Sequence, residues 1–240
     1  MNNAIDNVTH NITWAENSLS ECYLLLSIIE LELGNVRAAK NFGEKALDGF
    51  NEDKNIMNVS VYNCYFNLSN IEKALGNKVA AKNYMEKSIE AIKPKQNPDH
   101  YTLANGYATL SMMEKELGNL EAAKYLVNRA IAIDIANLDT QYEFLPHHYS
   151  YASIIEHALC NFLVAKNLIE KAIKSMPDNP SYHLGMFYWN LSQLEFSIGN
   201  KIASKMQGDI ALNICKKCLD PSHRVFAKFN IYFKTHFNQG

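Results

Sequence analysis

One short pattern recurs five times along this chain at a nearly constant interval. A turn-forming pair ending in asparagine lies at Gly34-Asn35, Gly76-Asn77, Gly118-Asn119, Cys160-Asn161 and Gly199-Asn200. Repetition with a period of tens of residues is typical of arrays in which each unit packs only against its neighbours. For a chain of 240 residues, this pattern favours one repeat array over two small globular domains.

The residues before and after each pair predict two helices joined by a turn. Tyrosine, then a leucine-serine or alanine-serine step, then glutamate precede each turn, with serine at Ser27, Ser69, Ser111, Ser153 and Ser192. Small residues follow each turn at two fixed positions, such as Ala39 and Ala46. Apolar residues three or four positions from these small residues build one helical face. Glycine suits a turn that needs a left-handed backbone, so Cys160 predicts a different turn geometry or a longer helix in the fourth repeat.

These features together resemble the tetratricopeptide repeat (TPR), over about Ser18 to Leu219. The period of about 42 exceeds the usual 34 and is similar to the kinesin-light-chain and bacterial-regulator branches of that family. Linkers containing Pro-Asp-His or Pro-Ser-His, at Pro98 and Pro221, strengthen that likeness. The resemblance implies an all-α fold, a right-handed α-α superhelix (TPR solenoid) of five helix-turn-helix repeats with a C-terminal capping helix.

The expected organisation has three parts. A polar N-terminal segment covers 1–17, and a capping helix lies within 220–240. Between them, 18–219 divides into repeats at about 18–57, 58–99, 100–140, 141–179 and 180–219. The apolar first helix then needs a cover, which the Trp14 segment, a second copy of the chain or a further domain could supply. Self-association through the terminal helices would give a homodimer.

Each repeat also carries a glutamate four residues before the turn and a lysine six residues after it, as in Glu30 and Lys40. The TPR family usually has tyrosine and glutamate at these places. We expect the two side chains to pair within each hairpin. Exposed ion pairs contribute roughly 0 to 1 kcal/mol, so the alternative is that both face water independently.

By resemblance, the first helices of successive repeats line a concave peptide-binding groove. The residues implied are Asn63, Phe66, Asn70, Lys73, Asn105, Met112, Lys115, His147, Ile154, His157, Met186, Trp189, Gln193 and Phe196, with Leu24, Ile28, Leu31, Ala108 and Ser150 in the same stripes. Asparagines can hydrogen-bond a peptide backbone, and the aromatic rings can hold apolar anchors. Alternatively, the C-terminal helix covers Trp189 and Phe196.

Composition and motifs exclude several function classes. The formal net charge of −2 gives no basic field for nucleic acid or anionic membrane. No export signal or apolar run long enough to span a membrane is present, so a cytoplasmic protein with reduced cysteines is expected. No phosphate loop or nucleophile motif occurs, and Cys215, Cys218 and His223 are too few for a structural zinc site. We therefore expect no catalytic residues, no metal and no cofactor.

Two functions fit these expectations. The first is a scaffold or adaptor that binds a peptide segment of a partner protein. The second is the sensory or regulatory TPR arm of a bacterial signalling or transcription-regulatory protein, which binds a signal peptide or small ligand and needs an output domain.

Overall fold

The computed structural model describes residues 19–52, 58–92, 100–137, 144–177 and 179–237, whose regular secondary structure is entirely helical. The chain forms two compact units, Met1–Leu117 and Gly118–Gly240. No helix in the described ranges is long and apolar enough to cross a membrane.

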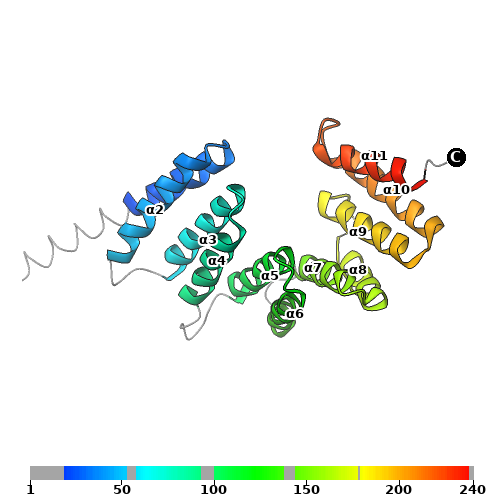
Figure 1. Ribbon diagram of the computed structural model, residues 1–240, viewed down its shortest axis with the longest axis horizontal. Helices are drawn as coiled ribbons and strands as arrows, with labels where there is room; N and C mark the ends of the chain where they lie inside the picture. The colour runs from blue at the N-terminus through cyan, green and yellow to red at the C-terminus, as the bar shows by residue number, and fades with distance from the viewer. Residues whose placement is uncertain (1–18, 53–57, 93–99, 138–143, 178, 238–240) are drawn as a thin grey trace, which may run out of the picture. The chain divides into compact units, whose positions relative to one another are not determined.

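The first unit is a stack of antiparallel helices (Figure 1). Residues 19–32 form its first helix. The helices after it are α2 (Val36–Glu52), α3 (Asn58–Ala74), α4 (Lys78–Ile92) and α5 (His100–Glu116). Successive helices contact one another from α2 to α5.

The second unit repeats the same arrangement (Figure 1). Its helices are α6 (Leu120–Ala136), α7 (Leu145–Ala158), α8 (Phe162–Lys174), α9 (Tyr182–Ile198), α10 (Lys201–Cys218) and α11 (Arg224–Phe237). Hairpins α7–α8 and α9–α10 account for most of its packing, and α11 closes the C-terminal end against α9 and α10.

The turn between the two helices of a repeat has a left-handed residue at its centre. Gly34, Gly76, Gly118 and Gly199 have φ of 82° to 95°, and Cys160 has φ of 61°. The prediction of a different fourth turn was therefore wrong: Cys160 adopts the conformation of the glycines although it carries a Cβ. A non-glycine residue in this region costs roughly 1–2 kcal/mol, and the surrounding hairpin holds it there.

Outside the third repeat, where Ser111 donates to the Ala108 carbonyl of its own helix at 2.6 Å, the recurring serine joins the two helices of a hairpin. Its hydroxyl donates to the carbonyl of the small residue twelve positions later, with distances of 2.6 Å for Ser27 to Ala39 and 2.7 Å for Ser69 to Ala81. Ser153 and Ser192 make the same bond to Ala165 and Ser204. A buried hydroxyl needs such a partner, and a small residue lets the helices approach closely enough to provide it.

The glutamate and lysine of the repeats form ion pairs, but not within one hairpin. Lys40 Nζ lies 2.7 Å from Glu72 Oε1 of the next repeat, and Lys82 Nζ lies 2.7 Å from Glu114. In the second unit, Lys124 pairs with Glu156 at 2.9 Å and Lys166 with Glu195 at 2.7 Å. The predicted pairing of Glu30 with Lys40 was therefore wrong. The lysine side chain extends along the stacking direction, so it reaches the next repeat instead of its own.

The asparagine of the turn takes the other carboxylate oxygen. Asn77 Nδ2 donates to Glu72 Oε2 at 2.7 Å, and Asn35, Asn161 and Asn200 bond to Glu30, Glu156 and Glu195 in the same way. Burial raises the pKa of Glu72, but the hydrogen bonds from Lys40 and Asn77 outweigh it, and the pKa lies below its ordinary value. The Glu72 carboxylate is thus held ionised between its own turn and the preceding repeat.

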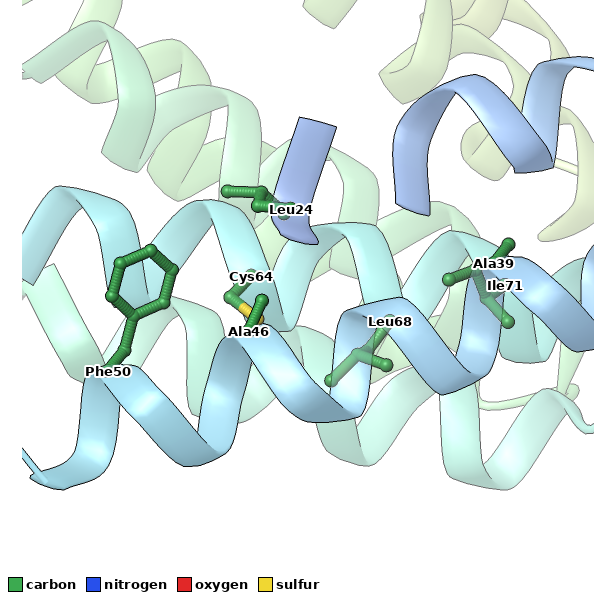
Figure 2. Packing of buried hydrophobic residues seen from close by; sticks show 7 residues of the cluster. All are labelled: Leu24, Ala39, Ala46, Phe50, Cys64, Leu68 and Ile71. Atoms are coloured by element: carbon green, nitrogen blue, oxygen red, sulfur yellow. The ribbon is translucent and has the colours of Figure 1, made fainter. Parts of the chain in front are cut away.

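One core cluster of the first unit lies between its first three helices. Figure 2 shows its buried side chains: Leu24 from the first helix, Ala39, Ala46 and Phe50 from α2, and Cys64, Leu68 and Ile71 from α3. Alanines on α2 let α3 approach closely, and the larger side chains of α3 fill the space. Repeat-to-repeat packing therefore builds the core, as expected for an array without a central core.

Candidate functional site

Three stripes of the predicted site stay accessible on the first helices of the repeats. The first contains Asn63, Asn105, His147 and Met186, the second Asn70, Met112, Ile154 and Gln193, and the third Lys73, Lys115, His157 and Phe196. All of these residues are at least partly exposed. Positions three, four and seven apart share one face of a helix, so each first helix presents its members together.

A fourth predicted stripe is largely buried. Leu24, Ala108, Ser150 and Trp189 are buried, and Phe66 is half-buried. These positions face the first helix of a neighbouring repeat; the Asn190 side chain, for example, donates to Ser150 Oγ at 3.3 Å. The stripe serves packing between repeats more than contact with a ligand.

In the first unit the accessible surface is rich in amides and charge. Asn63 is exposed on α3, where Phe66 stacks on Tyr62 with ring centroids 5.9 Å apart. Lys73 Nζ lies 3.4 Å from Glu116 Oε1, so its charge is largely balanced. Lys115 forms no ion pair among the described residues. Within the described part of this surface, Lys115 therefore remains available for an acidic ligand.

In the second unit the surface carries histidine and aromatic rings instead. His147 lies against the rings of His183 and Phe187, with centroids 4.5 and 5.5 Å away. His157 Nε2 lies 2.8 Å from Ser197 Oγ in the next repeat. The neighbouring His148 is buried and bonds to Asp134, so it belongs to the core.

Helix α11 covers both large rings predicted for the C-terminal end of the site. Trp189 is 7% exposed, with its centroid 4.2 Å from that of Phe229. Phe196 is half-buried against His236 at 4.3 Å. The alternative in which the C-terminal helix folds over these rings is therefore the observed arrangement.

Two hollows lie elsewhere on the second unit. One, of about 670 Å³, lies along α10 from Lys201 to Asn213 and is also lined by Phe237. The other, of about 440 Å³, lies between Leu212 and Phe226. Neither is lined by a residue of the predicted site.

Cysteine chemistry has little support in the described residues. All five cysteines are free. Burial raises the pKa of the Cys215 thiol to about 11, which keeps it protonated and unreactive near neutral pH. No group of histidine, cysteine and carboxylate side chains suited to a metal occurs in the described ranges.

Sequence reasoning missed the role of two recurring polar residues. The serine that bonds the second helix and the asparagine that holds the glutamate are visible as repeated letters. Their invariance across five repeats was the signal that they do structural work. Neither belongs to the accessible stripes.

Comparisons with known proteins agree with this geometry. The tetratricopeptide-repeat family profile matches residues 62–94, which lie in the second repeat. The structure of BtubC (BKLC) from P. vanneervenii superposes with a TM-score of 0.73 at 16% identity, covering 91% of this chain and 89% of that one. The protein folds as a TPR solenoid.

Two further structures place this TPR solenoid near both branches suggested by the sequence. A putative kinesin light chain of Podosopora anserina with nearly identical TPR-like repeats has a TM-score of 0.70 at 13% identity, over 84% of this chain and 96% of that one. The Rap conjugation gene regulator of plasmid pLS20, in complex with the Phr* peptide, has a TM-score of 0.73 at 13% identity, over 91% of this chain and 58% of that one. A comparison with curated protein sequences finds no match.

The TPR fold has a consequence for the class of function. Such folds are typically protein-interaction or regulatory scaffolds without catalytic residues of their own. Identities of 12–16% carry the fold and not the ligand.

Proposed function

We propose that this TPR protein is a non-catalytic interaction scaffold that binds an extended peptide segment of a partner protein on its first helices. The observation that carries the proposal is the contrast between stripes. The positions at which successive repeats pack together are buried, and their burial recurs from one repeat to the next. At the three accessible stripes, by contrast, the side chain differs between repeats. Variation at accessible positions of a regular array is what selective recognition of one peptide requires.

The chemistry of the stripes defines the peptide. Asn63, Asn70 and Asn105 each offer an amide donor and acceptor at accessible positions of the first unit. An extended backbone can satisfy both groups without a sequence requirement. Lys115 adds a cation that favours an acidic side chain, while Met112 on the same unit offers apolar contact to aliphatic side chains. We therefore propose a peptide with apolar residues and at least one carboxylate.

The proposal also concerns place and partners. All five thiols are free, which suits a reducing compartment, and we place the protein in the cytoplasm. No nucleic-acid or membrane partner is proposed, because the formal net charge of −2 supplies no attraction to either. A metal, a cofactor and catalytic residues have no part in the proposal.

Peptide selection on the intact protein tests the proposal. A library of random twelve-residue peptides is panned on the immobilised chain, and the best binder is measured by calorimetry. The variant Asn70→Ala, Asn105→Ala removes two hydrogen-bonding groups worth about 0.5–1.5 kcal/mol each. Its affinity for the selected peptide should fall about tenfold.

A matched variant supplies the control. Asn41 and Asn83 are exposed on α2 and α4, on the second helices of their repeats. Asn41→Ala, Asn83→Ala should leave the affinity unchanged. Equal losses in both variants, or failure of any peptide to bind, would contradict the proposal.

A second candidate is a regulatory arm that senses a signal peptide. It is favoured by the likeness to a Rap regulator whose structure contains a bound peptide. Hydrogen exchange with and without the selected peptide separates the two. A scaffold should gain protection only along the contacted first helices, whereas a sensor should change protection on the second helices of both units as well.

A further inference from the structure

The first helix exposes a face that every later repeat buries. Cys22, Leu25, Leu26 and Ile29, here called the N-terminal packing face, are all exposed, the last three at 60%, 41% and 51%. One period later, at the same positions of α3, Cys64, Asn67, Leu68 and Ile71 are all buried. The positions of Leu26 and Ile29 are also buried in the third, fourth and fifth repeats, at Leu110, Met113, Ala152, Ile155, Leu191 and Leu194.

The second helix of the preceding repeat is what covers these positions elsewhere. On α3, the Cys64 thiol bonds to the Gly43 carbonyl at 3.3 Å, and Leu68 packs on the bare backbone of Gly43. Figure 2 shows Ile71 beside Ala39 of α2. A partner for the N-terminal packing face must likewise present a helix with small residues where the leucine and isoleucine meet it.

At the edge of this face, the ion pair that recurs in the later repeats is also incomplete among the described residues. Glu72, Glu114, Glu156 and Glu195 each receive a lysine from the preceding repeat at 2.7–2.9 Å. Glu30 is bonded by Asn35 Nδ2 at 2.7 Å, but no cation pairs with it in the described ranges. By its place in the repeat, the missing partner is a lysine that follows a small residue on the covering helix.

We propose that the N-terminal packing face docks a helical hairpin of a second, different protein, whose covering helix carries a small residue followed by a lysine for Glu30. Residues 1–18 contain no lysine or arginine, so they cannot supply the lysine that pairs with the equivalent glutamate in every later repeat. The chain's own lysines at Lys40, Lys82, Lys124 and Lys166 already hold a glutamate. The proposal is independent of the peptide surface, because no residue of that surface belongs to this face.

A second copy of the chain is a poorer occupant for a similar reason. Lys205 follows the small Ser204, but α11 packs over that part of α10. Tyr232 Oη lies 3.2 Å from Ser204 Oγ, and Phe233 closes on Gly208. The small residue of this step is therefore covered by the chain itself, although Lys205 is exposed. The exposed Ala227-Lys228 step on α11 has Lys234 seven residues after the alanine, where the second helices of the repeats have their second small residue.

A duplicated hairpin of this protein serves as a defined probe. Residues 58–99 are copied in front of Glu16 in the full chain, which places the copied Lys82 one repeat before Glu30. Docking should bury Cys22 as Cys64 is buried, and burial slows reaction of a thiol with iodoacetamide. Peptide-mapped alkylation of Cys22 should slow at least tenfold, while the exposed Cys160 and Cys218 react as before.

The charge requirement is tested in the same fusion. Glu30→Gln should restore at least part of the Cys22 reactivity, and Lys82→Met in the copy should remove that effect of Glu30→Gln. In the unfused chain Glu30→Gln should change nothing. Unchanged Cys22 reactivity in a fusion whose helical content has risen, or a Glu30→Gln effect that persists with copied Lys82→Met, overturns the proposal.

Photo-crosslinking in the source cell identifies the occupant. Leu26 is replaced by p-benzoylphenylalanine in the full chain, with the exposed Tyr125 replaced as a control. The expected adduct is a helical segment of another protein with a lysine after a small residue, reduced about tenfold by Glu30→Gln. Adducts with residues 1–18 or with a second copy, or adducts no more frequent than at Tyr125, would refute the proposal.

Discussion

The two ends of the repeat array treat the same kind of surface in opposite ways. At the C-terminal end, α11 covers the last hairpin, and Phe229 is fully buried against Trp189. At the N-terminal end, the first helix leaves Leu25, Leu26 and Ile29 exposed. Both surfaces derive from the same repeat, so the difference lies in α11, which covers one of them.

This contrast distinguishes the packing of one repeat on the next from the cover of the last repeat by a separate helix. A repeat buries its apolar surface only against neighbours, so each end needs either a dedicated cap or a partner. The sequence of α11 departs from the repeat where it matters: Phe237 lies beside Lys205, where a repeat would bring a glutamate. The C-terminal end is thus finished by aromatic packing, and the N-terminal end retains repeat chemistry.

Removing the cap should have the largest effect. Phe229→Ala deletes a fully buried ring and should destabilise the second unit by about 4 kcal/mol. With Trp14→Phe as background, fluorescence of Trp189 follows this transition in urea. Ile231→Ala on the exposed side of α11, where the side chain is 66% exposed, should change stability by less than about 0.5 kcal/mol. Equal effects would mean that α11 does not cap the array.

The equivalent leucines of the first and second repeats give the next test. Leu68→Ala empties a fully buried site and should cost about 3 kcal/mol. Leu26→Ala, one repeat earlier, should cost less than about 1 kcal/mol, because its side chain already meets water. Urea unfolding of both variants measures the difference. A cost at Leu26 as large as at Leu68 would show that the first helix is covered in the isolated chain.

The glutamates allow the same comparison with charge. Glu72→Gln removes an ion pair whose carboxylate is buried but whose lysine is 37% exposed, and it should cost about 2 kcal/mol after allowance for solvent screening. Glu30→Gln should cost less than about 0.5 kcal/mol, since Gln still accepts from Asn35. Thermal melts of the two variants at neutral pH compare them directly.

The pH dependence of the Glu72 effect has a definite sign. The folded-state pKa of Glu72 is lowered from 4.5, so its contribution to stability is present above pH 4.5. That contribution is lost as the pH falls through the lowered pKa. The difference in melting temperature between the wild type and Glu72→Gln should therefore shrink on acidification below pH 4.5. A difference that grew would contradict the assignment.

The smallest expected effect is a gain in the stability of the second unit. Cys160→Gly relieves a left-handed residue with φ of 61° and should stabilise the second unit by about 1 kcal/mol, less the entropy that glycine adds to the unfolded chain. Gly199→Ala is the reciprocal change and should destabilise by a similar amount. Urea midpoints of both variants test whether the fourth turn is strained.

The fold was predictable because the recurring residues are the ones that form the turns and the contacts between helices. Spacing of Tyr23, Ser27 and Ala39 and of their equivalents predicted paired helices, and the apolar face of 221–237 predicted the capping helix that is observed as α11. Pairing of Glu30 was not predictable in the same way. A glutamate ten residues before a lysine can meet it within a hairpin or across a stack, and only the direction of the side chains decides.

Helical spacing predicts which of the proposed site residues share a face of a helix, but not how exposed each side chain is. Stripes at Asn63, Asn70 and Lys73 follow from helical spacing, and these side chains are accessible. Trp189 follows from the same spacing, yet α11 buries it. Cover by a distant segment depends on contacts that local spacing does not encode, which is why the rings at the C-terminal end differ from the amides nearer the other end.

The carboxylate held by both a turn asparagine and a lysine of the preceding repeat has a consequence for how such a chain can lengthen. Duplication or loss of one whole 42-residue segment leaves every lysine one repeat ahead of a glutamate, because the bonded residues are the same letters in each copy. The spacing is not strictly fixed, because Lys166 and Glu195 are 29 residues apart and still pair at 2.7 Å, whereas Lys40 and Glu72 are 32 residues apart. Recombination between copies is therefore one route by which the number of repeats can change without loss of an ion pair.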